Sequence, residues 1–181
     1  MKSFVLFLVL VTSAARAAEI WDPPSEGEIA RQFSKHPATH IYSSYPPKDI
    51  RGGRAYHGIE QIGIERTGCY GTCPSYSLVI NRDGTFHYHG DRFTKRRGGW
   101  HGTVDASQLT RVLSYVAEVN YFDFADLYGV NESDLPGTFT LVKTSIQKKV
   151  IYDYGNVGPA RLVAFEDMID HLLEGAKWKR D

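Results

Sequence analysis

The sequence predicts a single α+β domain, with a mostly antiparallel sheet and two main helices packed on one face of it. Residues 59–90 contain three strand-like segments that form a meander, and residues 139–154 form a hairpin. Helical periodicity is found separately, between these two groups of strands and after the second group. Strands and helices that are segregated along a chain in this way are typical of the α+β class.

The size and composition of the chain fit one globular domain. It has 181 residues, of which 42% are hydrophobic, 13% aromatic and 23% charged. A chain of this length buries enough apolar surface for one core. This composition disfavours intrinsic disorder and a coiled coil.

Residues 1–17 have the features of a cleavable secretory signal peptide. Lys2 gives a positive start, residues 4–11 are an unbroken apolar run, and Ala15-Arg16-Ala17 is a small-x-small cleavage site. We therefore expect cleavage after Ala17 and a periplasmic or secreted location. The apolar run is too short for a mature membrane-spanning helix, and no second run follows it. The mature protein is expected to be soluble, without membrane insertion.

The net charge of the mature chain bears on its partners. Loss of residues 1–17 removes two basic residues and no acidic one, which changes the formal net charge from +0 to about −2. A near-neutral charge disfavours a dedicated nucleic-acid or membrane-surface binder. We therefore expect an unknown ligand or protein partner, and no nucleic acid.

Residues 18–58 are expected to form an N-terminal arm outside the main domain. Ser25 followed three positions later by Glu28 has the form of a capping box, which predicts a short helix to about Ser34. Residues 36–56 contain several prolines and glycines and no clean period, so an irregular segment is expected there.

The α+β domain is expected to span residues 59–178. Apolar alternation defines the meander, in which Asn81-Arg82-Asp83-Gly84 predicts the second turn. A basic loop at residues 91–100 leads into a short strand expected at 100–104. The buried strand positions expected are Ile59, Ile62, Ile64, Tyr76, Leu78, Ile80, Phe86 and Tyr88.

Two helices follow with clear signals. Asp105 to Gln108 is a capping signature that opens a helix to about Asn120, and Pro159 opens a second helix that ends near Gly175. Between them, residues 139–146 and 149–154 form the hairpin. The expected helical core positions are Leu109, Val112, Leu113, Val116 and Val119, then Leu162, Phe165, Ile169 and Leu172.

Cys69 and Cys73 are the two cysteines of the chain, in the loop between the first two strands. A turn through Gly71 brings cysteines at i and i+4 within the ~4.4–6.8 Å between Cα atoms that a disulfide requires. An oxidising compartment favours such a bond. A redox-active pair is the alternative, although redox dithiols usually have two intervening residues at a helix N-terminus. A zinc site is a weaker one, because two cysteines need two more ligands.

The remaining candidates are a metal site and a binding surface. His87 and His89 lie at i and i+2 on one strand face, and with His101 they are weak candidates for a metal site. No metal and no cofactor are expected. No nucleophile elbow, glycine-rich phosphate loop or HExxH motif is present. The candidate binding surface comprises Arg66, Tyr70, Tyr76, Arg96, Arg97 and Trp100.

Residues 66–76 read Arg-Thr-Gly-Cys-Tyr-Gly-Thr-Cys-Pro-Ser-Tyr. This run resembles the R-x-x-C-[FY]-G-x-C-P-x-Y signature of a family of exported bacterial domains of unknown function. The resemblance covers about residues 59–178 and implies a fold without an activity or a catalytic residue. Within it, an acid such as Asp134 is a candidate partner for Arg66. Further similarity extends through Asp83-Gly84, Trp100-His101-Gly102, Phe122, Asp134 and the helix at Pro159.

The sequence therefore favours an exported, non-catalytic binding or interaction module with a disulfide-closed loop. The alternative is an enzyme or a thiol-disulfide redox protein centred on Cys69 and Cys73.

Overall fold

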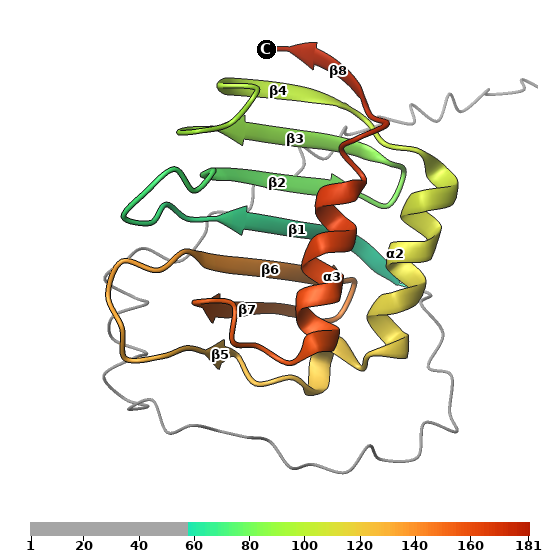
Figure 1. Ribbon diagram of the computed structural model, residues 1–181. Helices are drawn as coiled ribbons and strands as arrows, with labels where there is room; N and C mark the ends of the chain where they lie inside the picture. The colour runs from blue at the N-terminus through green and yellow to red at the C-terminus, as the bar shows by residue number, and fades with distance from the viewer. Residues whose placement is uncertain (1–57) are drawn as a thin grey trace, which may run out of the picture.

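The computed structural model describes residues 58–181. The expected signal peptide, and the N-terminal arm with its expected helix from Ser25, lie outside the described residues apart from Gly58 at the arm's end. The first described strand is β1, and the first described helix is α2 (Figure 1).

An eight-stranded sheet forms one layer of the domain, in the order β5-β7-β6-β1-β2-β3-β4-β8 (Figure 1). Neighbouring strands are antiparallel, except that β5 pairs with β7 in parallel. β1 lies between β2 and β6, near the middle of the sheet. The strands are β1 Ile59–Arg66, β2 Tyr76–Asn81, β3 Thr85–Gly90, β4 Gly98–Thr103, β5 Leu127–Tyr128, β6 Gly137–Thr144, β7 Lys148–Tyr154 and β8 Lys177–Arg180.

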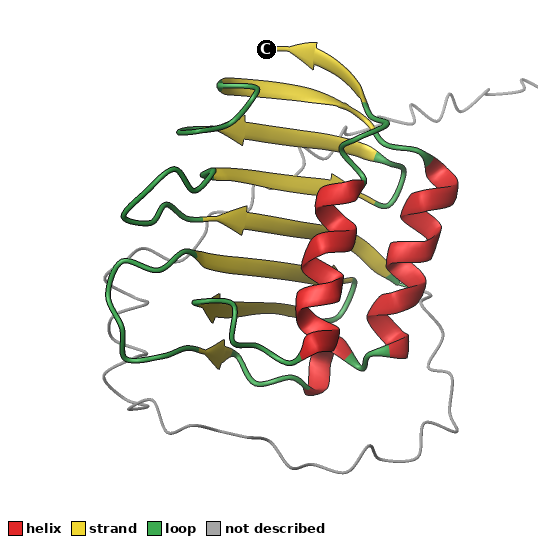
Figure 2. Cartoon of the chain, viewed as in Figure 1, coloured by secondary structure: helices red, strands yellow, loops and turns green. Residues whose placement is uncertain are grey.

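Two helices form the second layer and cover the same face of the sheet (Figure 2). Helix α2 spans Ala106–Glu118 and begins at its predicted cap, where the Asp105 side chain accepts a hydrogen bond from the Gln108 amide. Helix α3 spans Ala160–His171 and begins directly after Pro159. The prediction of one α+β domain with a mostly antiparallel sheet is confirmed. A 3₁₀ turn, η1 Tyr121–Asp123, follows α2.

The core lies between the helices and the sheet. Tyr121 is fully buried there, and its hydroxyl lies 2.8 Å from the Thr140 hydroxyl on β6, so the buried polar atom has a partner. Most predicted core positions are buried, while Leu113 and Tyr76 pack against the core from partly exposed positions. The fully buried aliphatic and aromatic side chains include Ile62, Ile64, Leu78, Ile80, Phe86, Leu162, Phe165 and Ile169.

Strand β8 was not predicted, because a four-residue Lys-Trp-Lys-Arg segment has no recognisable apolar alternation. It extends the sheet beyond β4 and beyond the expected end of the domain at residue 178. Gly102 permits this pairing, since a Cβ atom there would lie 1.9 Å from the Lys177 carbonyl oxygen. Trp178 then packs on Phe86 and Tyr88 with ring centroids 4.8 and 5.2 Å away.

None of the helices within residues 58–181 is both long and apolar enough to cross a membrane.

Candidate functional site

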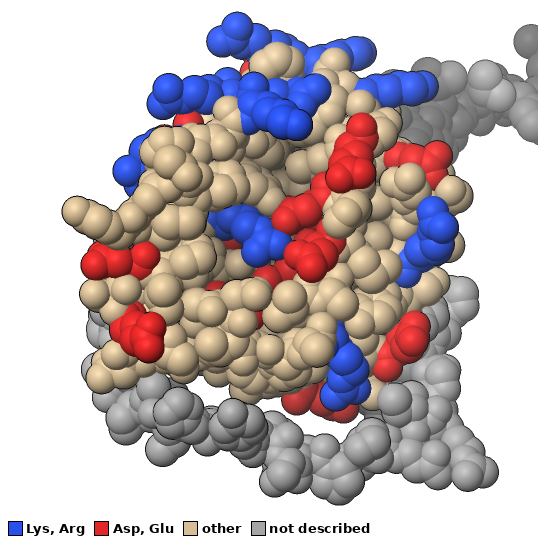
Figure 3. All heavy atoms as spheres, viewed as in Figure 1, with Lys and Arg blue, Asp and Glu red and all other residues tan. Residues whose placement is uncertain are grey.

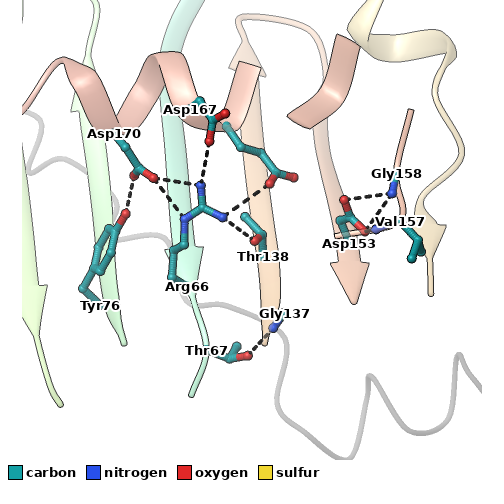
Figure 4. A network of polar contacts seen from close by, with 11 residues as sticks. Arg66, Thr67, Tyr76, Gly137, Thr138, Asp153, Val157, Gly158, Asp167 and Asp170 are labelled. Carbon is teal, nitrogen blue, oxygen red and sulfur yellow. Dashed lines mark hydrogen bonds and ion pairs between the residues drawn. The ribbon is translucent and has the colours of Figure 1, made fainter. Parts of the chain in front are cut away.

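Arg66 lies at the end of β1 and points toward α3 (Figure 4). Its Nε and Nη2 atoms donate to Asp170 Oδ2 at 3.0 and 2.8 Å, and its Nη1 donates to Thr138 Oγ1 at 2.9 Å. Glu166 Oε2 and Asp167 Oδ1 lie 3.5 and 3.7 Å from the guanidinium. One cation at the strand end thus contacts three acidic side chains of one helix.

Tyr76 begins β2 beside Arg66, and its hydroxyl donates to the other carboxylate oxygen of Asp170 (Figure 4). Burial and the adjacent Asp170 charge raise the pKa of Tyr76, so the hydroxyl keeps its proton. Burial alone would lower the pKa of Arg66, but Asp170, Tyr76 and Glu166 together raise it. The Arg66 charge is therefore permanent, and both Asp170 oxygens are held.

Glu166 is the buried member of the cluster. Its side chain is only 1% exposed, and its Oε1 atom has no hydrogen-bond partner within the described part of the chain. Burial, followed by the charge of Asp153, raises the pKa of Glu166 to about 8, although Arg66 opposes the shift. The carboxyl group is therefore mainly protonated at neutral pH.

Asp153 lies at the end of β7, beside the chain that leads into α3 (Figure 4). Its Oδ1 accepts from the amides of Val157 and Gly158 at 2.9 and 3.0 Å. Burial raises the pKa of Asp153, while these two backbone hydrogen bonds oppose the rise. Asp153 thus fixes the entry to α3, and the helix in turn places Glu166 and Asp170 above Arg66.

A disulfide closes the loop between β1 and β2, as predicted. Cys69 and Cys73 are bonded with their Cα atoms 5.6 Å apart. We name residues 67–75 the clasped loop. Tyr70, the residue after the first cysteine, is 90% exposed.

Backbone hydrogen bonds join the clasped loop to two neighbouring segments. The amide of Thr67 donates to the Gly137 carbonyl at 2.9 Å, and the amide of Tyr70 donates to the Asp134 carbonyl at 3.1 Å. The amide of Ser75 donates to the Arg92 carbonyl at 2.9 Å. The suggested pairing of Arg66 with Asp134 is therefore wrong. Asp134 holds the loop through its backbone, and Arg66 pairs with α3 instead.

The chain belongs to a family described as Domain of unknown function (DUF6438). The family match covers residues 60–173. It includes the clasped loop, Arg66 and the acidic residues of α3, and it ends before β8. No curated protein matches the chain.

In this DUF6438 domain, a row of aromatic rings connects two parts of the predicted surface. Tyr76 stacks on Tyr88 at 5.4 Å between centroids, Tyr88 meets Trp178 at 5.2 Å, and Trp178 meets Trp100 at 6.4 Å. The Arg96 guanidinium lies 4.2 Å from the Trp178 centroid and 5.9 Å from that of Trp100. Arg66, Tyr76, Arg96 and Trp100 therefore lie along one continuous series of contacts.

The side chains of two predicted surface residues lie apart from this row. Tyr70 is at the exposed side of the clasped loop. Arg97 touches the row only through its backbone, where its carbonyl accepts from Trp100 Nε1 at 3.1 Å, while its side-chain Nε donates to the Asp91 carbonyl oxygen at 2.9 Å. Sequence reasoning missed Glu166, Asp170 and Trp178. A signal for the two acids was present, because Glu166 and Asp170 lie four apart on α3 and so share one face.

The histidines of β3 lie on the face of the sheet that the helices do not cover. His87 and His89 alternate with the buried Phe86 and Tyr88 and are exposed. His87 faces His101 across the β3–β4 pair, and His101 Nδ1 lies 2.6 Å from Asp181 Oδ1. Within residues 58–181, no three or more His, Cys, Asp and Glu side chains form a group suited to a metal ion.

Proposed function

We propose that this domain is an exported, non-catalytic interaction module that binds a protein partner through the clasped loop. The observation that carries the proposal is the Tyr70 ring, which is 90% exposed on a loop that a disulfide closes. Tyrosine is a common interface anchor, because it brings a large amphipathic contact area with few rotatable bonds.

The restraint of the clasped loop supports this proposal. The disulfide and the backbone hydrogen bonds to Gly137, Asp134, Asp91 and Arg92 limit the conformations of the loop before any partner arrives. Binding by a loop of this kind loses less conformational entropy than binding by a free loop. The same restraint orients Tyr70 relative to the sheet.

A second exposed aromatic residue lies on the adjoining loop. Phe93 is 58% exposed and has a positive φ of 56°, which is unfavourable for a residue with a side chain. Its neighbour Arg92 bonds to Ser75 through the backbone, so the two loops form one edge of the domain. We therefore include Phe93 with Tyr70 in the binding surface.

The position of the cysteines supports a structural disulfide over redox exchange. Cys69 and Cys73 lie between two strands, and neither is at a helix N-terminus, where the helix dipole lowers a thiol pKa. An oxidising compartment outside the cytoplasm also fits such a bond. The proposal of export further predicts a mature N-terminus at Ala18, which mass spectrometry of the purified protein checks.

Site-specific photocrosslinking tests the interaction surface. A benzophenone side chain is placed at position 70, 93 or 146 in the producing cell. Ile146 is the matched control, because it is 89% exposed on the β6–β7 turn, at the opposite end of β6 from the residues that pair with Arg66.

We expect one covalent adduct of defined mass from positions 70 and 93 and none from position 146. Adding Cys69→Ser and Cys73→Ser together should reduce the yield at position 70, because the loop loses its restraint. Absence of an adduct at both loop positions, or the same adducts at all three positions, overturns the proposal.

A further inference from the structure

In the described residues, basic side chains predominate at the sheet edge formed by β4 and β8, and acidic side chains predominate elsewhere. The β3–β4 loop and residues 177–181 carry seven basic residues, and the acidic residues in these segments are Asp91 and Asp181. The remainder of residues 58–181 has seven basic and fourteen acidic residues. Figure 3 shows the basic atoms gathered over β4 and β8. We name this set the basic edge, which comprises Arg92, Lys95, Arg96, Arg97, Lys177, Lys179 and Arg180.

A hollow of about 530 Å³ lies against this edge. Strand register explains its lining, because Lys179 pairs with His101 and Lys177 with Thr103 between β8 and β4. His101 and Thr103 pair in turn with residues of β3. The polar lining residues are Thr85, His87, His101, Thr103, Lys177 and Lys179.

The chemistry of this lining suits an anion. An anion accepts hydrogen bonds. The lysine ammonium groups can only donate them, and the hydroxyl and imidazole groups are also able to donate. No acidic residue lines the hollow, although two carboxylates hold lining residues from outside it: Asp83 Oδ1 accepts from Thr85 Oγ1 at 2.6 Å, and Asp181 Oδ1 lies 2.6 Å from His101 Nδ1. The volume lies within the ~300–1,000 Å³ typical of small-ligand sites. One charged sugar unit therefore fits the hollow, where Lys177 and Lys179 supply the cations. Arg96 and Arg180 lie on the other face of the same sheet edge, over Trp178 and Trp100.

We propose that the hollow and the basic edge bind an anionic polysaccharide through its carboxylate or sulfate groups. This is a second binding surface, centred on the hollow of β3, β4 and β8, and its β3–β4 loop residues adjoin the clasped loop through the Ser75–Arg92 backbone hydrogen bond. A single small anion needs only the hollow, whereas basic residues on both faces of the edge match a chain with repeated charges that passes around it.

The ring contacts favour a polysaccharide over a nucleic acid. Proteins that bind single strands without sequence preference stack bases on exposed aromatic side chains. Here Arg96 covers Trp178 at 4.2 Å, and the Arg180 guanidinium lies 5.8 Å from the Trp100 centroid. The only phenyl group that lines the hollow belongs to Phe86, which is buried.

Edge lysines also have a simpler role. An exposed edge strand can pair with another chain, and lysines on it discourage that pairing. Lys177 and Lys179 on β8 fit this role, which makes no use of the hollow. The two roles are separated by measuring both polysaccharide binding and self-association of the same variants.

The test uses the protein purified from its producing cell in calorimetric titrations at 0.15 M salt. The probes are a sulfated heparin octasaccharide, a carboxylated oligogalacturonate, a neutral dextran oligosaccharide and a single-stranded oligonucleotide with the charge of the octasaccharide. The edge variant is Lys177→Gln with Lys179→Gln. The control variant is Arg111→Gln with Lys148→Gln, which makes the same change in net charge away from the edge.

We expect saturable binding of at least one anionic oligosaccharide and none of dextran. The edge variant should bind about ten-fold more weakly, because it loses two charge-assisted contacts, and the control variant should bind within about two-fold of the parent. Three results overturn the proposal: no saturable binding of either anionic oligosaccharide, equal losses in the two variants, or equal or tighter binding of the oligonucleotide. Self-association of the edge variant with unchanged binding would assign the lysines to edge protection alone.

Discussion

Arg66 and Asp170 are 104 positions apart in the chain, and Arg66 Nη2 lies 2.8 Å from Asp170 Oδ2. The contact joins the end of a central strand to the third turn of α3. Since the clasped loop begins at residue 67, the same arginine fixes the base of the proposed binding loop to the helix layer. The stability of the helix layer and the position of the loop should therefore depend on one cluster of side chains.

Replacement of Arg66 should be costly. In Arg66→Gln, Asp170 loses its cation and Glu166 its nearest positive charge, in a site where the Arg66 side chain is only 21% exposed. Removal of one partner from a largely buried ion pair lowers the free energy of unfolding by about 3 kcal/mol. Urea unfolding measures the loss. Arg82→Gln, at an exposed turn, should change stability by no more than about 0.5 kcal/mol. Similar values for the two variants would contradict the role of Arg66.

Glu166 should make stability fall as pH rises. Its pKa is about 8 in the folded protein against an ordinary 4.5, so the unfolded chain releases this proton first. The contribution of Glu166 is fully present below pH 4.5 and is lost as pH rises to 8. Glu166→Gln has no such loss.

Urea unfolding at pH 5 and pH 8.5 checks this sign. The stability of Glu166→Gln relative to the parent should increase by roughly 3 kcal/mol between the two pH values. Glu132→Gln, at an exposed position, should show no such change. A constant difference between Glu166→Gln and the parent would exclude a raised pKa.

Loss of the disulfide should have a modest global effect. By the loop-entropy relation, closing a five-residue ring stabilises the folded state by about 2 kcal/mol, so Cys69→Ser with Cys73→Ser should lower stability by that amount. Thiol titration of the unfolded parent should find free thiols only after reduction.

The reduction potential distinguishes the two roles of the cysteines. A structural bond should have a potential below about −300 mV and exchange slowly with glutathione. A potential near −200 mV, with rapid exchange, would favour the redox alternative.

Gly102 should be intolerant of a side chain. In Gly102→Ala the new Cβ would lie 1.9 Å from the Lys177 carbonyl oxygen and 2.8 Å from the Phe86 ring. β8 must then move and carry Trp178 with it, at a cost of about 2 kcal/mol. Tryptophan fluorescence and thermal unfolding report both effects. Gly175→Ala is the matched control, since no atom lies within 4 Å of its Cβ position. An unshifted emission spectrum in Gly102→Ala would contradict the close approach of β8.

Local patterns were sufficient for most elements. The Asp105 cap, the Pro159 start and the apolar spacing of both helices are short-range features, and the structure has α2 and α3 where these features occur. Likewise, the spacing of Cys69 and Cys73 in a glycine-containing turn was enough to predict the disulfide between them. β8 was not predicted, because its pairing depends on β4 and a strand of four residues has too few positions to show alternation.

The sequence by itself determined the α+β class, the helices and the closed loop, because spacing along the chain decides which side chains share a face. Only the tertiary structure decided the partners of Arg66, the aromatic row from Tyr76 to Trp100, and the meeting of β8 with β4. These contacts join segments far apart in the chain. The register of the strands and the packing of α3 across the sheet decide which residues meet. The local sequence around one partner therefore does not identify the other.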